Sequence, residues 1–233
     1  MKSPLMQEGV DLPEPKVFVV DDDHALRESL RWLVQSLGLA VEVFANAEDF
    51  LAAYDCTQPG CLVLDVRLPG ISGLNLQDQL AARGLSLPVI LITGHAEFST
   101  AVRGLRAGAV DFLEKPFSDQ ELLDRIREAI GADRAARLVE AERAEVTALV
   151  SLLTEREREV MTLVVAGKSN KVIAAELSLS PKTVEVHRAH VMRKLQVESV
   201  ADLVRLAALL APDKDKSRSA PSDTSSDTSK GNP

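Results

Sequence analysis

The chain has 233 residues, 45% of them hydrophobic and 27% charged, which is typical of a globular protein that can bury a sizeable core. No apolar run approaches the roughly 18–20 residues of a membrane-spanning helix, and the first residues lack the apolar stretch of a signal peptide. We therefore expect a cytoplasmic protein without a membrane partner. Cys56 and Cys61 have no second pair beside them, so neither a zinc site nor a disulfide framework is predicted.

The formal net charge of −8 is unevenly distributed along the chain. Residues 1–130 carry 11 Lys and Arg against 20 Asp and Glu, whereas residues 150–212 carry 9 against 7. An acidic region therefore masks a mildly basic module of net charge +2. This asymmetry permits nucleic-acid binding by the second region but does not predict it alone.

The first 130 residues alternate short β-rich apolar runs with stretches of helical periodicity. Apolar residues recur at Leu26, Leu30, Leu33 and Leu37, which is the spacing of an amphipathic helix. The expected strands are Val17–Val20, Val41–Phe44, Leu62–Leu64, Val89–Ile92 and Val110–Leu113. Five strands alternating with five helices predict an α/β fold, a doubly wound five-stranded parallel sheet with both faces covered. Ligands of such sheets bind beyond the carboxyl ends of the strands.

Charged and polar side chains follow the predicted strands at this edge of the sheet. The run Asp21–Asp23 follows the first strand, and Asp65 ends the third. Carboxylates so close raise one another's pKa unless a cation neutralises them, and Mg²⁺ is a hard ion that prefers oxygen ligands. Thr93 and Lys115, which end strands four and five, add a hydroxyl and a positive charge. Together these groups predict a site that accepts a phosphoryl group.

These residues have three other possible interpretations. An aspartate after a strand is often a helix N-cap, and Asp23 can serve as one for the helix that follows it. A haloacid-dehalogenase-like phosphatase needs an acidic residue two positions after the nucleophile, where this chain has Arg67. A flavin-binding domain of the flavodoxin type needs a Ser/Thr/Gly-rich phosphate loop after the first strand, whereas Asp21–His24 repels phosphate.

Four segments of this region resemble the receiver domain of response regulators, over about residues 15–131. They are Val19–Asp23 (VVDDD), Leu64–Gly70 (LDVRLPG), Ile92–His95 (ITGH) and Phe112–Phe117 (FLEKPF). The resemblance implies that Asp65 is the phosphoacceptor, in a protein that is no enzyme beyond slow autodephosphorylation. It also implies Mg²⁺ as the cofactor, held by Asp22, Asp65 and the main-chain carbonyl of Arg67, with Asp21 assisting through water.

The same resemblance implies roles for three residues beside the phosphoacceptor. Lys115 would pair with the phosphoryl oxygens, Thr93 would bond to one of them, and Phe112 would be the aromatic residue that turns inward. Receivers of this kind carry a cis peptide after the lysine, here Lys115–Pro116. One departure from the usual pattern is Asp23, at a position where Glu is frequent.

The rest of the chain predicts helices only. Residues 132–149 contain no Gly or Pro and predict a helical linker. Beyond it, Thr154 and Glu157 form a predicted capping box, and Ser169 and Ser180 are expected to cap the next two helices. A fourth helix is expected from about Ser199 to Leu210, whereas the polar tail at 213–233 should be disordered.

Two segments of this helical module resemble the helix-turn-helix of LuxR-type regulators, Ser169–Ala174 (SNKVIA) and Ser180–His187 (SPKTVEVH). The whole chain is similar to the FixJ subfamily of NarL/FixJ response regulators. The expected parts are an N-terminal extension at 1–14, a receiver domain at 15–131, a linker at 132–149, an all-α four-helix DNA-binding domain at 150–212 and the tail.

Helical periodicity predicts which face of the third helix of this module meets DNA. Val184, Val191 and Leu195 share the core stripe, and the opposite face is free to enter a major groove. The expected DNA-binding residues are Lys171, Lys182, Thr183, Glu185, Val186, Arg188, Ala189 and Arg193. Val186 and Ala189 could touch thymine methyls, and Glu185 could accept from cytosine. Arg188 is ambiguous, because it could equally extend along the first helix of the module.

These features predict a two-component response regulator. The resemblance implies that a sensor histidine kinase phosphorylates Asp65, and we expect phosphorylation to promote receiver dimerisation and binding to promoter DNA. The expected partners are the kinase, promoter DNA, RNA polymerase and a second copy of the chain. The remaining alternative is that residues 150–210 form a bundle that docks proteins and binds no DNA.

Overall fold

The computed structural model describes residues 12–94, 104 and 108–211. Residue contacts divide the chain into two compact units, the first ending at Glu142 and the second beginning at Arg143. Among the described residues, no helix is both long and apolar enough to cross a membrane.

The first unit is built on a parallel sheet of five strands. The strands are β1 (Lys16–Val20), β2 (Ala40–Phe44), β3 (Gly60–Asp65), β4 (Val89–Thr93) and β5 (Asp111–Glu114). Their order is β2-β1-β3-β4-β5, and every neighbouring pair is parallel. The predicted doubly wound fold is therefore confirmed, and each strand lies within two residues of its predicted bounds.

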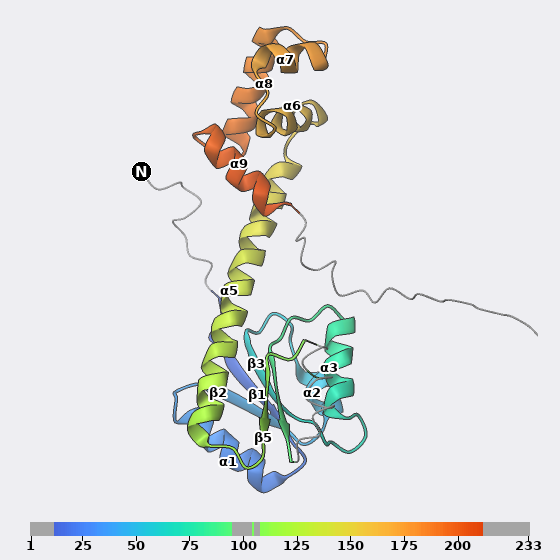
Figure 1. The fold of residues 1–233 in the computed structure, drawn as a ribbon, viewed down its shortest axis with the longest axis vertical. Coiled ribbons are helices and arrows are strands. Elements are labelled where there is room, and N and C mark those ends of the chain that lie inside the picture. The colour runs from blue at the N-terminus through green and yellow to red at the C-terminus, as the bar shows by residue number, and fades with distance from the viewer. Residues whose placement is uncertain (1–11, 95–103, 105–107, 212–233) are drawn as a thin grey trace, which may run out of the picture. The chain divides into compact units, whose positions relative to one another are not determined.

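Helices cover both faces of this sheet (Figure 1). They are α1 (His24–Gln35) and α5 (Asp119–Ser151) on one face, and α2 (Ala47–Ala53) and α3 (Gly73–Ala82) on the other. Because side chains alternate along a strand, Val17 and Val19 pack with α1 and α5, whereas Phe18 and Val20 pack with α2 and α3. The alternation of strands and helices also predicts a helix between β4 and β5, near residues 99–107, and this range falls outside the described residues except for Gly104.

Helix α5 continues through Gly131 as a single helix of 33 residues, so the expected linker at 132–149 is an extension of the last helix on the sheet. A glycine within a helix costs only about 1 kcal/mol relative to alanine. Packing of Ile126 and Ala129 before it, and hydrogen bonds of Asp133 after it, offset that cost. Gly131 is therefore no boundary in the structure.

The second unit contains a group of four short helices that follow the end of α5. They are α6 (Glu155–Val165), α7 (Asn170–Glu176), α8 (Pro181–Lys194) and α9 (Val200–Leu209). One apolar core joins them, with Val160, Ile173, Val184 and Leu195 fully buried. The predicted all-helical module is confirmed.

The predicted helix starts are present, with one difference in detail. Thr154 and Glu157 form the full capping box, and the Ser180 hydroxyl accepts from the amide of Thr183 at 3.0 Å. Ser169 occupies the N-cap position of α7, but its side chain makes no capping hydrogen bond. The expectation that the Ser169 hydroxyl caps α7 is therefore wrong. The helix starts there through the main-chain bond from Ile173 to the Ser169 carbonyl.

Candidate functional site

The fold brings three aspartates together at the carboxyl edge of the sheet. Asp21 follows β1 and Asp65 ends β3, and these two strands are direct neighbours in the sheet. Carboxylate oxygens of Asp21, Asp22 and Asp65 lie within 4.8 Å of one another. Asp21 and Asp65 are only 1% and 7% exposed, whereas Asp22 faces solvent. An all-oxygen donor set of this kind fits a hard divalent cation such as Mg²⁺.

Lys115 joins the two buried carboxylates. Its Nζ lies 3.0 Å from Asp21 Oδ2 and 2.5 Å from Asp65 Oδ2. Burial raises the pKa of Asp21, and the hydrogen bond from Lys115 partly offsets this rise. Burial lowers the pKa of Lys115, but its bonds to Asp65 and Asp21 outweigh that effect and leave the pKa raised. Lys115 therefore offsets part of the negative charge of the cluster.

The position of Lys115 follows from β4 and β5. Its amide donates to the Thr93 carbonyl at 2.7 Å, and the Lys115–Pro116 peptide is cis, as the resemblance implied. Thr93 ends β4 and is 5% exposed. Phe112, on β5, is half-buried and packs against the apolar cluster beneath α2 and α3. The structure thus brings Thr93 and Lys115 to the same edge as the aspartates.

Main-chain amides and one arginine hold the aspartates in place. Asp65 Oδ1 accepts from the Arg67 amide at 2.7 Å, and Asp21 Oδ1 accepts from the Asp23 amide at 2.8 Å. Arg27, which was not predicted as a site residue, donates to the Asp21 carbonyl at 2.6 Å. The sequence signal for this role is that Arg27 lies near the start of α1, only six residues after Asp21.

Two further residues have roles that clarify the site. Asp23 is the N-cap of α1, since its carboxylate accepts from the amides of Ala25 and Leu26. The capping interpretation of Asp23 is thus confirmed. Gly73 was not predicted as a site residue: a Cβ there would lie 2.2 Å from the Asp65 carbonyl oxygen. No sequence pattern indicated that close approach.

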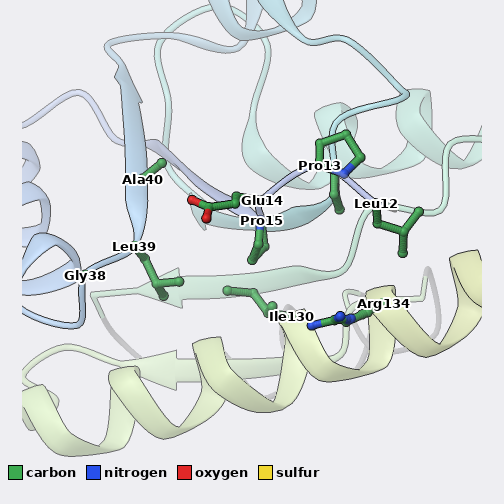
Figure 2. Close-up of a pocket in the computed structure, with 10 residues that line it drawn as sticks. Leu12, Pro13, Glu14, Pro15, Gly38, Leu39, Ala40, Ile130 and Arg134 are labelled. Carbon is green, nitrogen blue, oxygen red and sulfur yellow. The ribbon is translucent and has the colours of Figure 1, made fainter. Parts of the chain in front are cut away.

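A cavity of about 390 Å³ lies at the opposite edge of the sheet (Figure 2). Its walls come from the segment before β1, the start of β2 and α5, with Leu39, Ile130 and Arg134 among the lining residues. None of the acidic cluster lines it. The cavity is therefore separate from the acidic cluster.

In the second unit, α8 has one buried face and one exposed face. Val184, Val191 and Leu195 are at most 1% exposed, which confirms the predicted core stripe. The predicted DNA-facing residues that are exposed are Lys171, Lys182, Glu185, Val186, Ala189 and Arg193. Val186 is 48% exposed, which leaves its methyl groups available.

Thr183 and Arg188 differ from the other predicted DNA-binding residues. Thr183 is half-buried, and its hydroxyl lies 2.7 Å from that of Ser180. Arg188 lies beside Val160, Met161 and Val164 in a small gap against α6, and its guanidinium donates to Asn170 Oδ1 at 2.6 Å. The structure therefore favours the second of the two expectations for Arg188, extension along the first helix of the module.

A buried ion pair ties the start of α6 to the end of α8. Glu157 Oε2 lies 2.6 Å from Lys194 Nζ, and it also accepts from the amide of Thr154 at 2.8 Å. The Glu157 side chain is 5% exposed. The hydrogen bond from Lys194, followed by that from Thr154, lowers the pKa of Glu157 to about 2. This contact fixes the end of α8 relative to α6.

Comparison with known proteins shows the same two-part organisation. Residues 17–127 match the family described as response regulator receiver domain, and residues 151–207 match the luxR family of bacterial regulatory proteins. Nodulation protein W of Bradyrhizobium diazoefficiens is 46% identical, over 83% of this chain and 86% of the relative. FixJ of the same organism is 44% identical, over 82% of this chain and 93% of the relative.

Solved structures show the same similarity. The response regulator StyR is 44% identical, with a TM-score of 0.77 over 84% of this chain and 99% of that chain. Full-length FixJ from B. japonicum is 42% identical, with a TM-score of 0.52 over 84% of this chain and 97% of that chain.

The Glu157–Lys194 pair generates a pH-dependent prediction. Because the folded pKa of Glu157 lies below its usual 4.5, its stabilisation is fully present above pH 4.5 and is lost as the pH falls towards 2. Glu157→Gln should lower the free energy of unfolding at pH 7 by about 1.5–3 kcal/mol. It should also flatten the dependence below pH 4.5. Urea unfolding followed by circular dichroism measures both, with exposed Glu155→Gln in the same helical turn as control. Equal losses in the two variants would contradict the assignment.

Proposed function

Because this chain belongs to the response regulators that join a receiver domain to a LuxR-type DNA-binding domain, we propose that phosphorylation of Asp65 by a sensor histidine kinase controls its binding to promoter DNA. The family makes it a two-component transcription regulator, with a histidine kinase and promoter DNA as partners. We assign the receiver to residues 15–131, the linker to 132–149 and the DNA-binding domain to 150–212. The observation that carries the proposal is the contact of Lys115 with Asp21 and Asp65 at the carboxyl edge of the sheet.

In this proposal, Asp65 is the nucleophile. Its carboxylate attacks the phosphorus of a phosphohistidine, the P–N bond breaks, and the imidazole leaves. Lys115 lies 2.5 Å from the carboxylate, so its charge stays beside the acyl phosphate after the transfer. Asp22, Asp65 and the Arg67 carbonyl would hold Mg²⁺, with Asp21 acting through water. Receiver domains generally bind Mg²⁺ at such an acidic pocket, where the ion neutralises phosphoryl oxygens.

Phosphorylation should be lost when Asp65 is changed. With a small phosphodonor and Mg²⁺, the wild-type protein should gain one phosphoryl group, and Asp65→Asn should gain none, because an amide is not a nucleophile for this reaction. Intact-protein mass spectrometry measures the gain. Asp55→Asn, an exposed carboxylate outside the cluster, is the control and should be labelled like the wild type. Undiminished labelling of Asp65→Asn would place the phosphoryl group elsewhere.

The switch that we propose runs through Thr93 and Phe112. The Thr93 hydroxyl moves towards the phosphoryl group, and the space that this opens lets Phe112 turn further inward. Phe112 is half-buried and has apolar neighbours that can accept it. This change would reshape the surface of β5 and of the helix expected near residues 99–107, a range that lies outside the described residues. The reshaped surface would favour a homodimer.

Sedimentation at micromolar concentration tests this dimerisation. The phosphorylated protein should sediment as a dimer and the unphosphorylated protein mainly as a monomer, because only the phosphorylated state presents the reshaped surface. Asp65→Asn treated with the same phosphodonor is the control and should stay monomeric. A monomer in all samples, with DNA binding still stimulated, would exclude dimerisation and favour relief of inhibition between the domains.

We propose that α8 enters the major groove of promoter DNA. Glu185, Val186 and Ala189 would face the bases, and Lys171, Lys182, Thr183 and Arg193 would contact the backbone. Exposure of all of these side chains except that of Thr183 supports this assignment. Arg188 would bind at most through the donors that its bond to Asn170 leaves free. RNA polymerase is the further partner on which a promoter-bound regulator would act.

Two lysines allow a matched test of the DNA surface. Lys182→Ala should lower affinity about three- to tenfold on every sequence and reduce the salt slope by about one, as the loss of a phosphate contact requires. Lys168→Ala is the control, because the Lys168 ammonium already lies 2.7 Å from Glu176. Fluorescence anisotropy against salt concentration measures both variants. An equal effect of the two substitutions would exclude Lys182 from the interface.

A further inference from the structure

Helix α5 is anchored, one turn beyond the sheet, by a polar contact that the proposed function does not use. Ala129 is the last residue of α5 that is buried against the sheet, and Val146 is the next apolar residue to be buried. Between them, along a stretch that is fully described, Asp133 is the only buried residue. A helical segment exposed to water over so many turns is only marginally stable by itself. The contact that holds α5 against the receiver beyond Ala129 is therefore made by Asp133 and its partners.

Asp133 is a buried carboxylate with two donors. It is 2% exposed, and its Oδ2 accepts from the Gly60 amide at 2.9 Å and from Arg137 Nε at 2.8 Å. A buried charge is costly unless it is paired and hydrogen-bonded. Gly60 and Arg137 both donate to Oδ2, and the buried Oδ1 has no hydrogen-bond partner among the described residues, so the loss of either donor would leave the carboxylate poorly compensated. The carboxylate thus links the helix to the start of β3.

Arg137 extends the contact to the loop between α2 and β3. Its NH1 donates to the carbonyls of Cys56 at 3.1 Å and Thr57 at 3.2 Å, and its NH2 donates to the carbonyl of Gln58 at 3.1 Å. The side chain is 17% exposed. The planar guanidinium can reach these carbonyls and the carboxylate together, which a lysine ammonium cannot do.

Gly60, whose main-chain amide makes the contact, connects it to the proposed phosphoacceptor. Its φ is 154°, and a Cβ there would lie 1.8 Å from the Lys16 carbonyl oxygen. Gly60 begins β3, the central strand whose six residues are all buried, and Asp65 ends the same strand. One rigid strand therefore carries the phosphoacceptor at one end and the anchor of α5 at the other.

We infer that Asp133 and Arg137 are positioning residues for signal transfer, because they fix the direction in which α5 leaves the receiver. This inference rests on the proposed function. With the anchor in place, the exposed part of α5 is a continuation of the receiver, so a change of receiver state or assembly is passed on to the helix. Without it, the same change is absorbed by bending of α5 beyond Ile130.

The test uses the full-length protein and three variants. Arg137→Ala removes the anchor. Arg137→Lys keeps the positive charge beside Asp133 but loses the planar guanidinium that donates to the loop carbonyls at the same time. Arg134→Ala is the matched control, an exposed arginine one turn earlier that takes no part in the anchor. The readouts are hydrogen exchange of the amides at 134–145, phosphorylation of Asp65 by a small phosphodonor, and the ratio of DNA affinities with and without phosphorylation.

In Arg137→Ala, exchange at 134–145 should rise at least about tenfold, phosphorylation should proceed as in the wild type, and the affinity ratio should fall close to one. Arg137→Lys should behave similarly, and Arg134→Ala should match the wild type. An unchanged affinity ratio in Arg137→Ala, beside a clear ratio in the wild type, would overturn the inference. A wild-type protein that is not phosphorylated, or whose DNA affinity does not respond, would instead overturn the proposed function. If Arg137→Ala fails to fold, Arg137→Lys decides.

Discussion

The contact of Lys115 with Asp21 and Asp65 is the interaction on which the first unit depends. Two carboxylates that are almost fully buried repel each other and lose their hydration, and burial accordingly raises the pKa of Asp21. One ammonium group within hydrogen-bonding distance of both compensates for this cost. The charge balance that Lys115 provides would change if a divalent cation or a phosphoryl group were bound, because either brings charge of its own to the same carboxylate oxygens. Any such change would alter how Lys115 divides its bonds, and in the proposed function this is what makes the edge of the sheet respond to phosphorylation.

The sheet topology is what makes this contact possible. Asp21, Asp65, Thr93 and Lys115 stand at the ends of four different strands, and only a parallel arrangement in the order β1-β3-β4-β5 places those ends side by side. The same order leaves the amino ends of the strands at the far edge, where Asp133 hydrogen-bonds to the first residue of β3. The two edges thus serve different purposes. One carries charge that can change, and the other fixes the helix that continues towards the second unit.

The sequence predicted the parts of this arrangement that have local patterns. Apolar runs located the strands, and the capping box of Thr154 and Glu157 located α6. Some residues whose roles depend on distant partners were not predicted. Gly73 is required by the approach of the Asp65 carbonyl, and Gly60 by that of Lys16, neither of which leaves a local signal. Arg137 lies within a helical stretch rich in charge, where nothing distinguishes it from Arg134 until the loop at 56–58 is seen to meet it.

The ion pairs of the second unit limit how strongly one copy can bind DNA. Of the nine Lys and Arg at 150–212, five are bonded within their own domain, namely Arg156, Lys168, Arg188, Lys194 and Arg205. Arg158, Lys171, Lys182 and Arg193 are the exposed cations left for phosphates. Four phosphate contacts correspond to a salt slope of only about 3–4, which is shallow for a specific regulator. Two copies on one site would double this number, so the small number of free cations is consistent with the dimerisation that we propose.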